Sequence, residues 1–253
     1  MARKLLLVFV VPVILIAAAI YLNTDPKSVA SRLAKTGFSR TDRLTYRMYL
    51  FGFIPACEAI FDSPKEEALN GKAVLHLNAT VRPLRSLSRL FNGYAILDSY
   101  IDAETGDPVI FRQKTVMQGK VVADKEVRYD QKGNFMTKGD EKRQILPHTQ
   151  DPLSLVYNLR KMKFAESGKF DMNINTNQKN YIFEATLTHK GIVIAKAPAR
   201  LALIKSTIRR RDKNRYHRSQ VDLVCLKDKE NLPILIKVSA SGFYLVAKLV
   251  NTN

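Results

Sequence analysis

The sequence has few of the residues that most often build metal centres and catalytic sites. Its 253 residues include two cysteines, four histidines and no tryptophan. Cys57 and Cys225 lack the spacing of metal ligands, and they allow either one intramolecular disulfide or two free, buried thiols. No histidine stands in an HExxH spacing, and the chain has neither a GxSxG elbow nor a P-loop. We therefore predict a protein that is not an enzyme, with no catalytic residues, no metal ligands and no cofactor.

Acidic residues are scarce as well. The chain has 23 Asp and Glu against 41 Lys and Arg, and its formal net charge at pH 7 is +18. Such an excess favours an anionic partner, which would be a nucleic acid, an anionic membrane surface or an acidic polymer. The basic residues are spread along predicted strands and no recognition helix stands out, so we predict no nucleic-acid partner. A lipid, an anionic envelope polymer and simple solvation of dispersed charge remain as interpretations.

The longest apolar run stands at the N-terminus. Behind Arg3 and Lys4, residues 5–22 carry no charge and are just long enough to span a bilayer as a helix. Residues 5–16 followed by Ala17, Ala18 and Ala19 also fit a cleaved signal peptide. We favour an uncleaved anchor because the apolar run continues through Leu22. This predicts a single-pass protein of the bacterial inner membrane with its C-terminal domain in the periplasm, whereas cleavage would make it secreted or periplasmic.

The chain then divides into three parts: an anchor or signal peptide at 1–22, a juxtamembrane linker or helix at 23–40, and a β-rich domain at 41–253. In the third part the hydrophobic period is two residues, which is typical of half-buried strands. We expect a polar turn at 63–71, a short helix at 83–92 and a solvent-facing His76. About a dozen short strands predict a mainly β domain, built as a strongly curved antiparallel sheet or a half-open β-barrel.

One segment among the strands has a helical pattern instead: DPLSLVYNLR, residues 151–160. Asp151 can cap the first turn and Pro152 suits the first helical position. Ser154, Asn158 and Lys161 recur at helical spacing as a polar stripe, while most of the circumference is apolar. A helix this apolar is usually buried, so we expect a plug that the strands surround. Arg160 projects from its apolar side.

Three short motifs resemble a family of bacterial exported proteins, the domain of unknown function DUF3108. The first is LDSYIDAETGDPVIF, and the second is Gln118-Gly119-Lys120 followed by Tyr129-Asp130. The third is the helical segment. The residues that carry the first and third motifs are Ser99, Asp102, Thr105, Pro108, Asp151, Ser154, Tyr157 and Arg160. The resemblance spans about Thr41 to Asn251 and implies an envelope location and a domain similar to the half-barrels that carry lipids and lipoproteins. It implies no reaction.

Two groups of residues are candidates for ligand binding. Tyr157 and Arg160 lie on the predicted helix, where Arg160 would hold a carboxylate or phosphate inside a cavity. Alternatively, Arg160 pairs with a buried acidic group or extends its head to water. The second group belongs to the basic run 209–218, which would bind lipid phosphates or acidic polysaccharide, or would be a solvated hairpin tip. Its candidate residues are Arg209, Arg210, Arg211 and Arg215.

These patterns favour a membrane-anchored binding module for an amphipathic anionic ligand, such as a lipid or a lipoprotein acyl chain. A structural or assembly factor that binds a protein or an acidic polysaccharide is the main alternative. An enzyme that modifies envelope polysaccharide is a weaker one. The three classes predict different interiors: an apolar cavity for a carrier, a filled barrel for a scaffold, and converging titratable groups for an enzyme.

Overall fold

A computed structural model describes residues 43–88, 92–162, 167–176, 178–194, 197–211, 219–227, 231–240 and 242–252. The predicted anchor, the juxtamembrane linker and Arg215 lie outside these residues. Among the helices that are described, none combines the length and the hydropathy needed to cross a bilayer.

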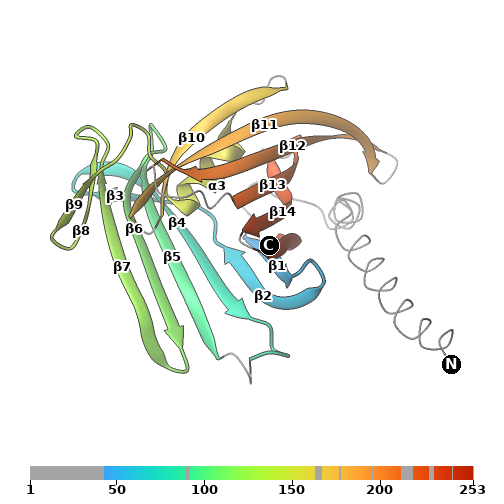
Figure 1. The fold of residues 1–253 in the computed structure, drawn as a ribbon, viewed down its shortest axis with the longest axis horizontal. Helices are drawn as coiled ribbons and strands as arrows, with labels where there is room; N and C mark the ends of the chain where they lie inside the picture. The colour runs from blue at the N-terminus through green and yellow to red at the C-terminus, as the bar shows by residue number, and fades with distance from the viewer. Residues whose placement is uncertain are drawn as a thin grey trace.

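The described residues form a 15-stranded antiparallel sheet and a single α-helix, α3 (Pro152–Lys161) (Figure 1). In chain order the strands are β1 (Leu44–Leu50), β2 (Ile54–Phe61), β3 (Lys65–Leu69), β4 (Lys72–Pro83), β5 (Gly93–Asp102), β6 (Pro108–Met117), β7 (Lys120–Asp130) and β8 (Phe135–Lys138). They continue with β9 (Glu141–Gln144), β10 (Gly168–Thr176), β11 (Lys179–Ile194), β12 (Ala197–Arg210), β13 (Ser219–Leu226), β14 (Leu232–Ala240) and β15 (Phe243–Thr252). The predicted mainly β class and the curved antiparallel sheet are confirmed.

The strand order is that of an open, curled sheet with β10 at one end and β9 at the other. The sheet runs β10-β11-β12-β13-β14-β15-β1-β2-β4-β5-β6-β7-β8-β9, and β3 pairs with β4 beside this path. The segment after β9 is linked to β10 at the other end, because Gln150 bridges Ile174 of β10 in a parallel pair. The Gln150 amide donates to the carbonyl of Asn173 at 2.8 Å, and the Asn175 amide donates to the carbonyl of Gln150 at 2.8 Å. The curled sheet is thus bridged by the segment that leads into α3.

Helix α3 lies inside this curl, between the β4–β5 strands and the strands from β10 onward (Figure 1). Leu153, at its N-terminal end, packs with Leu77 and Ile101. Leu159, at its C-terminal end, packs in a second cluster that contains Phe183. Because both ends bury leucines against different parts of the sheet, the helix fills the space that curvature leaves. The predicted plug is confirmed.

Two local predictions are wrong, and one strand was not predicted. The polar turn expected at 63–71 contains β3, a charged strand that forms a hairpin with β4. The helix expected at 83–92 is the end of β4 and then a turn through Ser88, while residues 89–91 lie outside the described part. Strand β9 was not expected at all. Each is a short, exposed or tip segment whose conformation depends on pairing with a neighbouring strand more than on its own hydrophobic pattern.

Cys57 and Cys225 do not form a disulfide, and both are free thiols.

Candidate ligand-binding site beside helix α3

The N-terminal end of α3 is fixed by a fully buried carboxylate. One oxygen of Asp151 accepts hydrogen bonds from the backbone amides of Leu153, at 2.7 Å, and Ser154, at 3.0 Å. The other oxygen accepts from the hydroxyl of Ser99 on β5 at 2.5 Å. Asp151, Ser154 and Ser99 are each 0% exposed. Burial raises the pKa of Asp151 to about 6, against the opposing effect of these hydrogen bonds.

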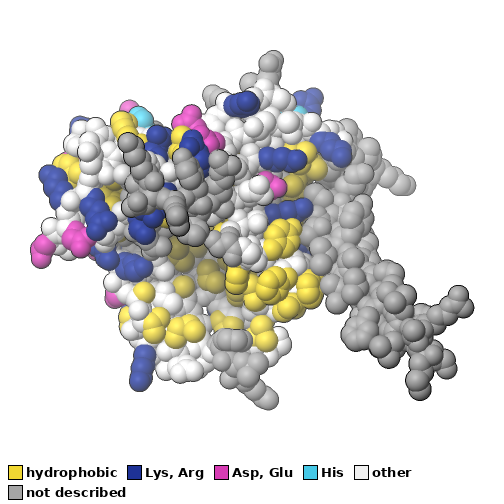
Figure 2. Space-filling model, viewed as in Figure 1, with side chains coloured by type: hydrophobic (Ala, Val, Ile, Leu, Met, Phe, Trp, Pro, Cys, Tyr) yellow, Lys and Arg dark blue, Asp and Glu magenta, His cyan; other side chains and the backbone are white. Residues whose placement is uncertain are grey.

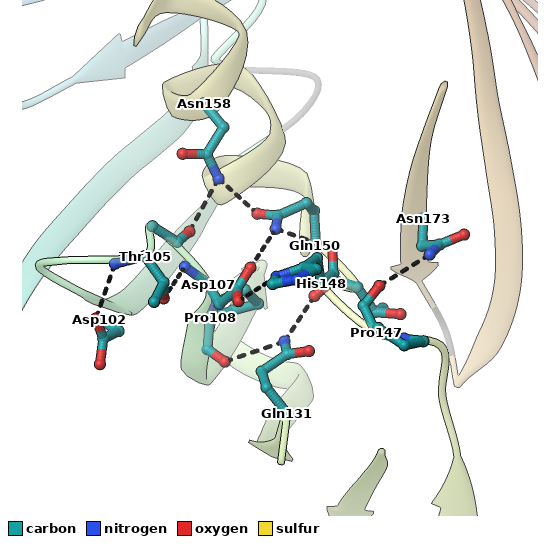
Figure 3. Close-up of polar contacts among 12 residues, drawn as sticks. Asp102, Thr105, Asp107, Pro108, Gln131, Pro147, His148, Gln150, Asn158 and Asn173 are labelled. Atoms are coloured by element: carbon teal, nitrogen blue, oxygen red, sulfur yellow. Dashed lines mark hydrogen bonds and ion pairs between the residues drawn. The ribbon is translucent and has the colours of Figure 1, made fainter. Parts of the chain in front are cut away.

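A second set of contacts holds the β5–β6 turn against the helix (Figure 3). Asp102 shapes the turn, since one carboxylate oxygen accepts from the amides of Glu104, at 3.0 Å, and Thr105, at 2.9 Å. The side-chain amide of Asn158 donates to the carbonyl of Gly106 at 2.9 Å. Gly106 has φ +74, and a Cβ there would lie 2.4 Å from Oδ1 of Asn158. Only glycine therefore fits this close approach.

The same side-chain amide of Asn158 also contacts the segment between β9 and α3. It donates to Oε1 of Gln150 at 2.8 Å, and Nε2 of Gln150 donates to Oδ1 of Asp107 at 3.0 Å. The second oxygen of Asp107 lies 2.7 Å from Nδ1 of His148 (Figure 3). Ser154 and Asn158 of the predicted polar stripe thus face protein rather than water, while Lys161 is exposed. These contacts position α3, and with the Ser99–Asp151 pair they bring together the first and third sequence motifs.

The C-terminal half of α3 borders a cavity of about 340 Å³. Its walls are mostly apolar and come from β1, β2, β4 and the helix: Leu44, Tyr46, Phe61, Leu75, Leu77 and Val156. Tyr157 and Arg160, the two predicted helix residues, both line it, together with Lys161. Nζ of Lys161 lies 5.7 Å from the centre of the Tyr157 ring. The cavity therefore combines hydrocarbon walls with two cationic side chains.

Arg160 is half-buried in this cavity wall and lacks a counter-ion in the part of the chain that is described. Its Nε is buried without a hydrogen-bond partner, and no described carboxylate forms an ion pair with it. Its neighbours are two buried groups, Tyr46 and Cys225. Burial raises the pKa of Tyr46 far above its usual value and that of Cys225 to about 12, and the guanidinium opposes both shifts. The Tyr46 hydroxyl donates to the carbonyl of Pro233 at 2.7 Å, away from Arg160.

Acidic groups are present as well, and they belong to the segment after β2. Asp62 and Glu66 line the cavity. Asp62 forms an ion pair with Arg43, with an N–O distance of 2.8 Å. Within the described residues, Asp62 is thus paired with an arginine that does not line the cavity, whereas the exposed Glu66 and Arg160 have no ion-pair partner. The arrangement can accommodate an apolar chain that ends in an anionic group.

The other candidates do not join this site. Arg209 is bound to Glu184, with a distance of 2.9 Å from Nε to Oε2, and Arg211 donates to Oδ1 of Asn173 at 2.8 Å. Neither they nor Arg210 line the cavity. The expectation for His76 holds only in part: its side chain is 19% exposed and lies 2.8 Å from Asp98 and 3.0 Å from Glu67.

Sequence reasoning missed the strand residues that complete the cavity, of which Tyr46 is the clearest. The hydrophobic pattern marks Tyr46 only as one member of an alternating apolar face. That alternation places Leu44, Tyr46, Leu75 and Leu77 on buried faces. It does not say that these faces meet beside Arg160, which depends on the curl of the sheet.

Comparisons with known proteins agree with this architecture. The family model described as "Protein of unknown function (DUF3108)" matches residues 45–241. A beta-barrel-like protein of the domain of unknown function DUF1849 from Brucella abortus has a similar fold: the TM-score is 0.52 and the identity 12%, over 84% of this chain and 96% of that chain.

A putative exported protein with a YmcC-like fold from Bacteroides fragilis also matches, with a TM-score of 0.31 and 6% identity over 85% of this chain and 96% of that chain. A search of the curated proteins found no match. The family model covers most of the β-rich domain and the motifs at both ends of the Ser99–Asp151 pair. The chain belongs to the DUF3108 family.

Proposed function

We propose that the β-rich domain is a non-enzymatic binding module whose cavity beside α3 holds an amphipathic anionic ligand, a lipid or a lipoprotein acyl chain. The observation that carries this proposal is Arg160. A guanidinium whose Nε is buried without a partner is costly for the folded protein. A carboxylate or phosphate in the cavity would supply the missing acceptor, and arginine can bind either group through two parallel hydrogen bonds.

The rest of the cavity suits the apolar part of such a ligand. Leu44, Phe61, Leu75 and Leu77 present hydrocarbon walls. Each methylene group that leaves water for such a wall contributes about 0.8 kcal/mol to binding. The volume of about 340 Å³ lies at the lower end of the range of small-molecule sites, roughly 300–1,000 Å³. This size fits a single chain or the part of a lipid next to its headgroup better than a whole lipid.

The proposal includes a place in the cell. The uncharged run at 5–22 would anchor the chain in the bacterial inner membrane and leave the β-rich domain in the periplasm. A cleaved signal peptide would place the same domain in the periplasm or outside the cell. In both cases the domain would work beside membranes that supply anionic amphiphiles.

Lipid extraction from the purified full chain tests the proposal. The chain is produced in a bacterium, and the bound lipids are quantified by mass spectrometry for wild type, Arg160→Met and Arg128→Met. Arg128 is an exposed control on β7 that does not line the cavity. We expect one anionic lipid near stoichiometric amount in wild type and in Arg128→Met, and its loss in Arg160→Met.

Lipid that adheres to the apolar N-terminus contributes equally to all three proteins, because they share that segment. Differences between the variants therefore report on the cavity alone. A second variant, Val156→Phe, fills the cavity without touching the charge and should also lose the lipid. Equal lipid content in wild type, Arg160→Met and Val156→Phe would contradict a ligand in this cavity and would favour a scaffold that binds a protein or a polysaccharide.

A further inference from the structure

The exposed large hydrophobic side chains of the described residues share one location, the tips of four hairpins. Phe51 and Ile54 flank the β1–β2 turn, and Phe243 follows the β14–β15 turn. Tyr94 begins β5 after the β4–β5 connection. The β6–β7 tip carries Met117, Val121 and Val122. We call these seven residues the apolar rim. Each of them is at least 42% exposed, so none is a core residue.

The four tips lie next to one another. The strands that bear them are consecutive in the sheet, from β14 through β15, β1, β2, β4, β5 and β6 to β7. The Phe51 amide donates to the carbonyl of Tyr244 at 2.7 Å, and the Phe51 and Phe243 ring centres are 6.1 Å apart. The Gln118 amide donates to the carbonyl of Asn92 at 2.6 Å, joining the β4–β5 and β6–β7 tips. The rim is therefore one continuous edge of the barrel-like sheet.

A groove of about 320 Å³ opens at this rim, apart from the cavity beside α3. It is lined by Cys57, Val81 and Ala95 and by two members of the rim, Tyr94 and Met117. Figure 2 shows hydrophobic side chains gathered in the lower part of the molecule, between the β6–β7 tip and the β1–β2 turn. An apolar surface that continues from exposed tips into a groove is unusual for a surface that meets only water.

The charges at the tips of the rim are cationic. Arg85 and Lys120 lie at the β4–β5 and β6–β7 tips, whereas Arg82, further from the tip, forms an ion pair with Glu58 at 3.6 Å. The described tip residues 50–57, 82–88, 92–95, 115–122, 240 and 242–245 contain no Asp or Glu. The turns at the opposite ends of these strands differ, because 62–64, 102–107 and 130–134 contain five acidic residues: Asp62, Asp102, Glu104, Asp107 and Asp130. Apolar tips that carry cationic and no anionic side chains match the surface of an anionic bilayer.

We propose that the apolar rim docks on an anionic lipid bilayer. Phe51, Phe243 and the valines of the β6–β7 tip enter the boundary between headgroups and acyl chains, while Arg85 and Lys120 contact lipid phosphates. In this orientation the groove faces the lipid. The inference uses no residue of the α3 cavity, so it stands or falls independently of the ligand proposed there.

The absence of tryptophan from the chain permits a direct test. Phe243→Trp places a single tryptophan in the rim, and Ala103→Trp places one in the exposed β5–β6 turn at the opposite end of the strands. The full chain is reconstituted in vesicles of phosphatidylglycerol and phosphatidylcholine that contain phosphatidylcholine brominated in its acyl chains. We expect strong quenching and a blue shift of the tryptophan emission in Phe243→Trp and neither effect in Ala103→Trp, although both variants carry the same N-terminus.

Two further conditions make the outcome decisive. Adding Arg85→Ser and Lys120→Ser to Phe243→Trp should remove most of the quenching, as should vesicles of phosphatidylcholine alone. Equal quenching of the rim and control tryptophans would overturn the proposal. So would a blue shift that needs no vesicles and rises with protein concentration, since the rim would then pair with a second copy of the chain. Quenching that is the same without phosphatidylglycerol would overturn the assignment to an anionic surface.

Discussion

The two ends of helix α3 differ in whether their buried polar groups have hydrogen-bond partners. At the N-terminal end, Asp151 is fully buried, and both of its carboxylate oxygens accept hydrogen bonds from described partners. At the C-terminal end, Arg160 lines a cavity, and its Nε has no hydrogen-bond partner among the described residues. Since buried polar groups in folded proteins are normally paired, the first end is explained by the fold alone. For the second end, the described residues supply no such partner, and we propose that a ligand does.

The comparison separates residues that attach the helix from the residue for which we propose a role in binding. Asp151, Ser154 and Asn158 fasten the helix to the β5–β6 turn and to β5. This rigid attachment holds the other end of α3 at a fixed place in the curled sheet. A preorganised charge of this kind binds a ligand without first losing side-chain freedom. Changes at the first end should therefore alter stability, and changes at the second should alter binding.

Asp151→Ala should have the largest effect on stability. It removes a helix cap, which costs about 1 kcal/mol, and it leaves the Ser99 hydroxyl buried without its acceptor, at about 1–3 kcal/mol more. We expect the free energy of unfolding in urea to fall by about 3 kcal/mol. Asp124→Ala, at an exposed position of β7, is the matched control and should change it by less than about 0.5 kcal/mol. Similar losses in both variants would remove the special role of the cap.

The pH dependence of stability should reveal the same carboxyl group. Its pKa is about 6 in the folded protein, against an ordinary value of 3.8, so the folded state binds the proton more tightly than the unfolded state. Its stabilising contribution is complete below about pH 4 and is lost as the pH rises through about 6, with a total of about 2–3 kcal/mol. Asp102 and Glu126 have lowered pKa values, so their contributions are lost only under more acidic conditions.

Asp151→Asn isolates this contribution, because asparagine is a good cap that does not titrate. Urea unfolding of both proteins between pH 4 and pH 7 should show a loss of stability in wild type that the variant lacks. Parallel curves for the two proteins would mean that Asp151 keeps an ordinary pKa.

Gly106→Ala should have an intermediate effect. It forces a Cβ to within 2.4 Å of Oδ1 of Asn158 at a backbone φ of +74. Gly119→Ala is a close control, since Gly119 has φ +75 and nothing lies within 4 Å of its Cβ position. We expect about 1 kcal/mol of destabilisation at Gly119, from backbone strain alone, and about 1–2 kcal/mol more at Gly106. Equal melting temperatures for the two variants would show that the turn does not need its close approach to the helix.

Arg160→Met should have the smallest effect on stability. Methionine keeps the apolar stem and removes a buried Nε that lacks a partner. We expect the free energy of unfolding of the ligand-free protein to stay within about 0.5 kcal/mol of wild type or to rise. Lys161→Met, one residue along the helix, serves as the control. A loss of more than about 2 kcal/mol in Arg160→Met alone would show that the arginine has a structural partner and would end the contrast between the two helix ends.

Local signals made the helix and its neighbouring turn predictable. Asp151 and Pro152 mark a helix start, and Asp102 followed by Gly106 and Pro108 marks a turn. Alternation of apolar residues located most of the strands, including β1, β5 and β13. These signals act over a few residues and need no knowledge of the rest of the chain.

Features that depend on distant partners were not predictable in the same way. Strands β3 and β9 have charged sequences, and only their hairpin partners show that they are strands. His76 was placed on the correct face of β4, yet that face carries Asp98 and Glu67 within hydrogen-bond distance. The cavity arises where β1, β2, β4 and α3 meet, so its volume depends on the curvature of the sheet. Tyr157 and Arg160 were predicted as candidate ligand-binding residues because they lie on the predicted helix. Tyr46 was not predicted, because it comes from a distant strand.

Binding of a fluorescent fatty acid and its uncharged methyl ester tests the central claim most directly. Both probes have the same apolar chain, so their affinities for one protein differ only through the anionic group. We expect wild type to bind the acid about tenfold or more tightly than the ester, since a hydrogen bond to a charged group contributes about 1.5–3 kcal/mol. Arg160→Met should bind both probes with the affinity that wild type has for the ester. Equal binding of the two probes by wild type, or a preference for the acid that survives in Arg160→Met, would contradict the assignment of this cavity.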